Sequence, residues 1–298
     1  MPARPHILVV NGRKVRQPVF VIGAPYSGTD ALARALKRSA GFHMTIGQPA
    51  VTSVVHAFAR SPSIQRGKGE AATTVLRDAF AQAWQVTPDS CLGCSAACRS
   101  AGGVAGAGTC IAERDILRYG DASPDLMYCA ESLVEAFGDA RIVQIIRDGR
   151  DVVASMLGDT ALISVFRPSL ANVEGDLPNP FFGLETPSDL ASWPQLSLAA
   201  RCALHWRGAV RQMARLRTGM SAEQLTTLRY EEVVRSPATA GRVVSEFIGA
   251  RVALGALPRT GPRRAVESGS WRRLLSPAQV KEIEQVAGTD LRRVGYGT

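Results

Sequence analysis

One segment near the start of the chain carries residues suited to binding a phosphate-like anion. The apolar run 18–22 is followed by a turn containing Gly23 and Gly28, and then directly by a helical pattern. A strand, a glycine-rich turn and a helix start aim backbone N–H groups and the positive end of a helix dipole at one place. The Gly23-x4-Gly28 spacing is that of a nucleotide P-loop, but Thr29 and Asp30 replace its lysine and Mg²⁺-binding hydroxyl. The turn therefore predicts an anion site but a poor ATP or GTP hydrolase.

A second segment whose side chains could bind an anion runs from Arg147 to Ser155. Arg147 follows the apolar run 141–146, which is typical of a strand buried on both faces of a parallel sheet. Open α/β sheets bind ligands at the carboxyl ends of their strands. Ser155 lies in the following helical pattern, so the two side chains could offer a guanidinium and a hydroxyl to a second phosphate. The alternative is a helix cap and ion-pair cluster, with Asp148 and Asp151 facing the helix dipole.

Together these segments resemble the sulfotransferases that use 3′-phosphoadenosine 5′-phosphosulfate (PAPS), including their bacterial members. In that family Pro-(Lys/Arg)-Ser-Gly-Thr-Thr after a strand holds the 5′-phosphosulfate, and Arg-Asp-Pro-Arg-Asp-x3-Ser holds the 3′-phosphate. This chain has Pro25-Tyr26-Ser27-Gly28-Thr29-Asp30, and Arg147 with Ser155 eight residues later. The resemblance implies that PAPS is the co-substrate. It implies phosphosulfate contacts from Tyr26, Ser27, Gly28, Thr29 and Asp30, and 3′-phosphate contacts from Arg147 and Ser155.

Two later elements extend the resemblance from about residue 18 to the C-terminus. Arg229-Tyr230-Glu231-Glu232 is similar to a Tyr-Glu-Asp element whose tyrosine approaches adenine, and Gly269-Ser270-Trp271-Arg272 is similar to a Gly-x-Trp-Lys/Arg element. Arg264 falls where cytosolic members place another arginine on the 3′-phosphate. The resemblance implies transfer of a sulfuryl group to a hydroxyl or amine of a small-molecule or glycan-like acceptor.

The residues expected to do chemistry depart from the family pattern. Tyr26 stands in place of the loop Lys or Arg, and Gln48 stands where bacterial members often have a glutamate base. Ala122 replaces a lysine found ahead of the second motif in many bacterial members. Candidate catalytic groups are then His56, His43 and the Tyr26 hydroxyl, although either histidine could equally be a packed or surface residue. The alternative function is a non-catalytic nucleotide- or partner-binding protein on the same fold.

Four cysteines fall in a glycine-rich stretch with the spacing Cys91-x2-Cys94-x3-Cys98 and Cys110. They could hold a structural zinc ion as metal ligands, and the other readings are free thiols, disulfides and an iron–sulfur cluster. Cys129 and Cys202 lie on apolar-patterned segments and are expected in the core, as is His205.

Composition limits the partners. The formal net charge is +9, but the basic residues are spread along the chain without aromatic interleaving, which argues against nucleic-acid binding. We expect no membrane span, because no apolar stretch approaches about 18 residues, and no signal-peptide pattern is visible. The expected location is the cytoplasm, with reduced cysteines. A homo-oligomer is compatible with the sequence.

These residues would be positioned by one α/β domain spanning residues 1–298. Alternating strand and helix patterns predict a three-layer P-loop-type fold, with a central parallel sheet and helices on both faces. Within it, 87–112 reads as an irregular Cys/Gly-rich insertion, and 158–196 as an irregular lid or substrate-side segment. Further patterns predict a strand over 225–230 and helices over 51–59, 71–84, 198–216, 233–247 and 277–287.

Overall fold

A five-stranded parallel sheet forms the centre of the protein in a computed structural model, which describes residues 7–66, 70–167, 173, 176–252, 254 and 267–297. In spatial order the strands are β4 (Phe42–Thr45), β5 (Arg118–Asp121), β3 (Val19–Ile22), β6 (Arg141–Ile146) and β7 (Leu225–Arg229). All four pairings between neighbours are parallel. Their carboxyl ends therefore share one edge of the sheet, as the sequence predicted for β3 and β6.

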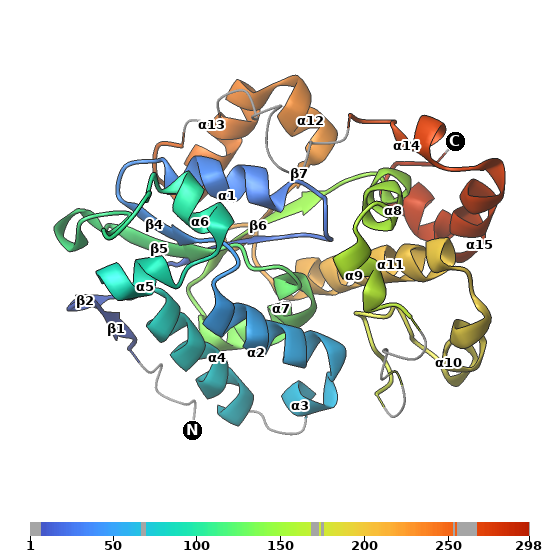
Figure 1. Cartoon of the computed structure of the whole chain (residues 1–298), viewed down its shortest axis with the longest axis horizontal. Coiled ribbons are helices and arrows are strands. Elements are labelled where there is room, and N and C mark those ends of the chain that lie inside the picture. The colour runs from blue at the N-terminus through green and yellow to red at the C-terminus, as the bar shows by residue number, and fades with distance from the viewer. Residues whose placement is uncertain are drawn as a thin grey trace.

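Helices cover both faces of this sheet (Figure 1). Along β3, Val19 and Val21 join one apolar cluster, whereas Phe20 and Ile22 join the other, because successive strand residues point to opposite faces. One face is covered by α1 (Thr29–Lys37), α12 (Tyr230–Arg235) and α13 (Pro237–Ile248), with α6 (Ala96–Ala101) against α1. The other face is covered by α2 (Pro49–Arg60), α4 (Glu70–Ala83) and α7 (Ala130–Ala136), and the short α3 (Ser63–Arg66) packs against α2 and α4. The predicted three-layer α/β arrangement is confirmed.

Three helices pack together beside the sheet, where the long α11 (Leu198–Gly219) contacts both α8 (Gly149–Leu157) and α15 (Pro277–Arg293). A capping box of Ser276 and Gln279 starts α15, with proline at its first position. The short α14 (Trp271–Leu274) precedes α15, and the hairpin of β1 (Val9–Val10) and β2 (Arg13–Lys14) turns at Asn11 and Gly12 ahead of β3. Among the described helices, none combines the length and apolarity needed to cross a bilayer.

The two stretches predicted to be irregular contain short helices. In 87–112 these are α5 (Pro88–Leu92) and α6, capped by the side chains of Thr87 and Ser95. The described part of 158–196 contains α9 (Thr160–Ser164), α10 (Pro187–Ser192) and a 3₁₀ turn at 193–195. Hydroxyl caps and helix-starting prolines make such short helices stable within a packed structure.

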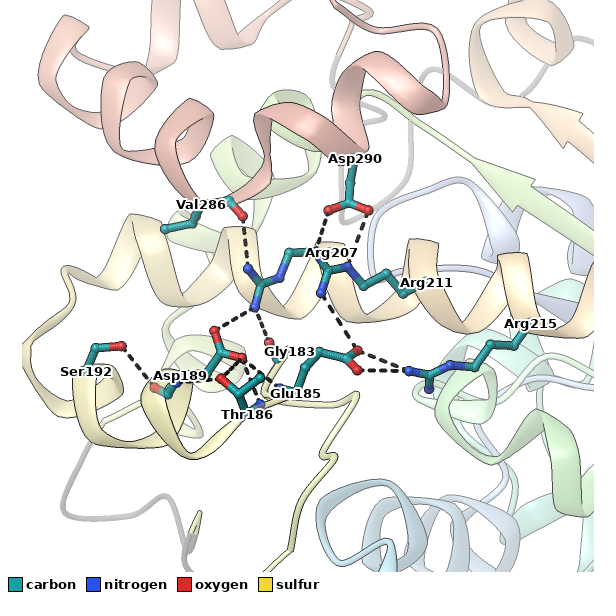
Figure 2. Close-up of polar contacts among 10 residues, drawn as sticks. All are labelled: Gly183, Glu185, Thr186, Asp189, Ser192, Arg207, Arg211, Arg215, Val286 and Asp290. Atoms are coloured by element: carbon teal, nitrogen blue, oxygen red, sulfur yellow. Dashed lines mark hydrogen bonds and ion pairs between the residues drawn. The ribbon is translucent and has the colours of Figure 1, made fainter.

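The segment 177–196 is anchored firmly to the helices beneath it. Its apolar side chains Phe181, Phe182, Leu184 and Trp193 are fully buried. Three arginines one turn apart on α11 hold its polar groups and those of α15 (Figure 2). Arg207 donates to the Gly183 carbonyl (2.6 Å) and pairs with Asp189 (3.3 Å), Arg211 pairs with Asp290 (3.1 Å), and Arg215 pairs with Glu185 (3.0 Å). The segment 177–196 is therefore packed firmly against the helices beneath it.

Candidate functional site

The glycine-rich loop follows β3 and ends at the first turn of α1. Gly28 has φ +101°, and a Cβ there would lie 2.6 Å from a ring carbon of Tyr230. A Cβ on Gly23 would lie 2.5 Å from the carbonyl oxygen of Ile145. Both positions therefore require glycine, because the loop passes directly over β6 and the tyrosine that follows β7. This close passage brings the first motif against the second.

Tyr26 joins this loop to two distant parts of the chain. Its backbone lies in the left-handed region at φ +61°, and its carbonyl accepts a hydrogen bond from Arg147 Nη1 (2.8 Å). Its hydroxyl donates to the carboxylate of Asp159, which also caps the N-terminus of α9. The sequence analysis did not find Asp159, because nothing in the spacing connects residues 133 positions apart.

Arg147 is the centre of the candidate site. The side chain follows the carboxyl end of β6, is only 2% exposed, and lies over the Tyr230 ring at 4.3 Å from the ring centroid. The indole of Trp206 donates to its carbonyl (3.2 Å). Burial raises the pKa of Tyr230, so this ring stays neutral beside the guanidinium. The structure thus brings the loop, Arg147 and Tyr230 together.

The acidic residues of the second motif are structural. Asp148 caps α8 by accepting from the Arg150 backbone (2.9 Å) and pairs with the Arg150 side chain (2.9 Å). The fully buried Asp151 accepts hydrogen bonds from the Gly269 backbone (2.7 Å), the Ser270 hydroxyl (3.1 Å) and the Trp271 backbone (2.9 Å). The cap and ion-pair interpretation therefore applies to Asp148, whereas Asp151 binds the C-terminal Gly-Ser-Trp element to α8.

The remaining residues that were predicted to contact the nucleotide lie in different environments. Ser27 is buried, and its hydroxyl has no hydrogen-bond partner among the residues described. The Asp30 side chain pairs with Arg34 one turn along α1 (2.8 Å), and Thr29 is the first residue of that helix. Ser155 is half-buried on α8 and donates to the Asp151 carbonyl (2.8 Å). Arg264 lies outside the described residues.

A buried carboxyl group, which the sequence analysis did not find, lies at the same edge of the sheet. Asp121 ends β5 next to β3, where it is paired with Phe20. It is fully buried and accepts hydrogen bonds from the Thr45 hydroxyl (2.5 Å) and the Ser123 backbone (2.7 Å). Burial raises its pKa to about 7, although both hydrogen bonds oppose the shift. A carboxyl group that is largely neutral below pH 7 can lie near a bound anion with little repulsion.

His56, a candidate base, is on α2 and is held between two charged groups. Its Nδ1 lies 3.5 Å from the Asp125 carboxylate, and its Nε2 lies 3.3 Å from Arg60 Nη1. Because arginine can only donate, Nε2 is the accepting nitrogen and Nδ1 carries the proton. Asp125 itself has φ +64°. Gln48, at the position of the family's glutamate base, caps the same helix by accepting from the Ala50 backbone (2.7 Å).

His43, the second candidate base, packs among the cysteines. It is buried on β4, with Nδ1 3.6 Å from Cys110 Sγ and the edge of its ring against Tyr119. Burial and the nearby Lys37 ammonium lower its pKa to about 3. These contacts give His43 a place beside the thiol groups, with no contact to the loop among the hydrogen bonds and ring contacts of the described residues.

The four clustered cysteines are all reduced, and two of them, Cys98 and Cys110, lie beside the Lys37 side chain. Cys91 Sγ lies 4.0 Å from Cys110 Sγ, and the Lys37 ammonium donates to the Met44 carbonyl (2.7 Å). A hydrogen bond from Cys94, the Lys37 charge and other polar contacts lower the pKa of Cys98 to about 6, against the effect of burial.

The zinc hypothesis is not supported. Within the described ranges, no group of three or more His, Cys, Asp or Glu side chains is arranged to hold a metal ion. The physical reason is that the Lys37 ammonium already supplies positive charge among the thiols. Cys129, Cys202 and His205 are core residues as predicted, each completely buried.

Comparison with known proteins identifies the family of this chain. The family model described as the sulfotransferase family matches residues 18–176, so the chain belongs to that family. No curated protein gave a match to the chain.

Several solved sulfotransferase structures are similar to this chain at low identity. The sulfotransferase domain from the Synechococcus PCC 7002 olefin synthase is 16% identical, with coverage of 92% of this chain and 94% of that chain and a TM-score of 0.48. A sulfotransferase from Alicyclobacillus acidocaldarius is 16% identical, with 94% of each chain covered and a TM-score of 0.47. The mouse sulfotransferase SULT7A1 complexed with PAP is 14% identical, with 97% and 88% covered and a TM-score of 0.45.

Proposed function

We propose that this protein transfers a sulfuryl group from PAPS to a hydroxyl or amine of a small-molecule or glycan-like acceptor. The observation that carries the proposal is the meeting of the glycine-rich loop, Arg147 and Tyr230 at the carboxyl ends of β3 and β6. A helix N-terminus, a buried guanidinium and a neutral aromatic ring are the groups that a phosphorylated nucleoside requires.

Each part of the donor has a candidate partner. The loop backbone over 27–30 and the buried Ser27 hydroxyl would hold the 5′-phosphosulfate. Arg147 and Ser155 would hold the 3′-phosphate, with Arg264 as a further candidate outside the described residues. Tyr230 would pack near adenine. In-line sulfuryl transfer depends on positioning and on donors aimed at the developing charge, which these groups would supply.

His56 would accept the proton of the acceptor. Its Nε2 lone pair is available for a proton once the hydrogen bond from Arg60 is released, and Asp125 would stabilise the imidazolium that forms. The Tyr26 hydroxyl would donate a hydrogen bond to the departing oxygen in place of the usual loop cation. The segment 177–196, whose Phe181 ring meets His56 edge-on, would form the acceptor-side wall.

Binding of adenosine 3′,5′-bisphosphate tests the donor site. We expect titration calorimetry to give tight binding to the wild type and about 30-fold weaker binding to Arg147→Ala, because a charge-assisted fork is lost. Arg242→Ala, which removes an exposed arginine from α13, is the matched control and should bind like the wild type. Absence of binding by the wild type would overturn the proposal.

A non-catalytic binding protein is the second candidate, and two observations favour it. Tyr26 carries no positive charge in the loop, and Gln48 is used as a helix cap. Incubation with sulfur-35-labelled PAPS and a panel of hydroxyl and amine acceptors separates the two functions. Labelled product supports the enzyme, whereas tight nucleotide binding without any transfer supports the binding protein.

A further inference from the structure

A second group of reactive side chains lies at the far end of α1 from the anion-binding loop. Lys37 is the last residue of this helix, and beside its ammonium are the thiols of Cys98 on α6 and of Cys110 in the segment that follows α6. The proposed sulfuryl transfer uses none of these groups. The sulfur atoms of Cys91 and Cys110 lie 4.0 Å apart.

The surroundings of Cys110 allow this separation to shorten. A disulfide needs the sulfur atoms about 2 Å closer than they are here. Cys110 is half-buried and follows an exposed stretch in which Gly103, Gly106 and Gly108 have open space around them. A Cβ on Gly102 would lie 2.8 Å from the Cys110 Cβ, so the glycine at that position lets the cysteine approach. Cys91, by contrast, is fixed and buried in α5.

We propose that Cys91 and Cys110 form a reversible intramolecular disulfide, which makes this cluster a site of oxidative modification. Hydrogen peroxide is the oxidant class. The accessible Cys110 sulfur attacks the peroxide, an S–O bond forms as the O–O bond breaks, and one water leaves. The Cys91 sulfur then attacks the sulfenic sulfur, the S–S bond forms, and the S–O bond breaks to release a second water. Two thiols are oxidised, and one peroxide is reduced to two waters.

Lys37 provides an electrostatic reason for the order of these steps. Its ammonium lies beside Cys110 in the reduced cluster, and its positive charge favours the Cys110 thiolate, although burial raises the pKa of that thiol overall. Cys91 is not among the thiols that contact this ammonium. The inference does not depend on nucleotide binding, so it stands or falls separately from the proposed function.

Peptide mapping of the full-length protein tests the pairing. Trypsin cuts after Arg99, which separates a peptide carrying Cys91, Cys94 and Cys98 from one carrying Cys110. We expect peroxide treatment to lower the intact mass by two hydrogens and to join these two peptides, and dithiothreitol to separate them again. Fragmentation of the joined species should place the bond at Cys91. A bond within the first peptide, between Cys94 and Cys98, would overturn the proposal.

Serine variants provide matched controls. Cys110→Ser, at a half-buried position, and Cys91→Ser should each abolish the joined peptides, whereas Cys94→Ser should retain them. Thermal unfolding checks that each variant is folded. Thiols that stay reduced under peroxide would contradict the inference, as would a metal ion found in the purified protein at one per chain and released together with titratable thiols.

Discussion

Tyr26 is the residue at which the chain departs furthest from its family, and its contacts indicate what a tyrosine does at this position. The carbonyl accepts a hydrogen bond from Arg147, while the hydroxyl donates to Asp159 and would exchange that bond for one to the departing oxygen during transfer. We therefore expect Tyr26→Phe to leave affinity for adenosine 3′,5′-bisphosphate within about threefold and to lower the transfer rate by about 100-fold, as for other lost transition-state donors. Binding titrations and labelled-sulfate assays measure the two effects. Equal losses in both would assign Tyr26 a purely structural role.

A cation at the same position should have the opposite effect. Tyr26→Lys would place an ammonium where the family has Lys or Arg, and Asp159 would hold it near the loop. We expect faster turnover of PAPS by this variant than by the wild type, measured as release of adenosine 3′,5′-bisphosphate. An unchanged rate would show that the loop charge does not limit the reaction.

Asp121 gives a pH dependence of stability with a defined sign. Its pKa is raised from 3.8 to about 7 in the folded protein, so the folded state binds more protons than the unfolded state between these values. Stability from this group is therefore present at low pH and is lost as the pH rises through about 7, by up to about 4 kcal/mol.

The measurement is thermal unfolding of Asp121→Asn beside the wild type. Asparagine keeps an oxygen for the Ser123 backbone and does not titrate. We expect the wild type to lose Tm relative to the variant between about pH 4 and about pH 7. Asp115→Asn, at an exposed carboxylate, is the control and should show no such trend. A constant difference between Asp121→Asn and the wild type would contradict the burial argument.

At the scale of elements, one carboxylate connects α8 to the segment before α15. Asp151→Ala leaves three donors around Gly269, Ser270 and Trp271 without their acceptor, so we expect the free energy of unfolding to fall by about 3 kcal/mol. Hydrogen exchange should show loss of protection at the Gly269 and Trp271 amides. Glu284→Ala removes a half-exposed carboxylate facing Arg150 and should cost under about 1 kcal/mol. A similar loss in both variants would argue against this role of Asp151.

Sequence patterns predicted the elements that are long or strongly apolar. The runs that became β3, β6 and β7 and the long helix α11 were recognised because burial on both faces, or on one helical face, leaves a clear periodicity. By contrast, β4 and β5 have only four residues each, with polar side chains among them, and neither was recognised. Asp121 was missed for this reason, since its place at the sheet edge depends on β5 being a strand.

The sequence predicted those parts of the candidate site in which one segment contains both a functional residue and the strand that positions it. The loop and Arg147 follow strands whose direction aims them at a common edge. The contacts of Tyr26 with Asp159 and of His56 with Asp125 depend on how helices pack across the molecule. The spacing of residues along the sequence does not predict that packing. The position of Lys37 also depends on packing, and its ammonium lies beside thiols that the sequence predicted to hold a metal ion.

At the scale of the whole molecule, the strand order constrains how the chain can assemble as it is synthesised. Among the strands of the described residues, the first central strand, β3, pairs with β5 and β6 alone, and β4 pairs with β5 alone. Until Arg118–Asp121 emerges from the ribosome, neither early strand has a partner, and β3 is not enclosed until Ile146 follows. We expect limited proteolysis of stalled nascent chains to find residues 19–22 cleavable before that point and protected after it. About half of the protein must therefore be made before its apolar centre has a place to fold, which makes the nascent N-terminal half a natural client for chaperones.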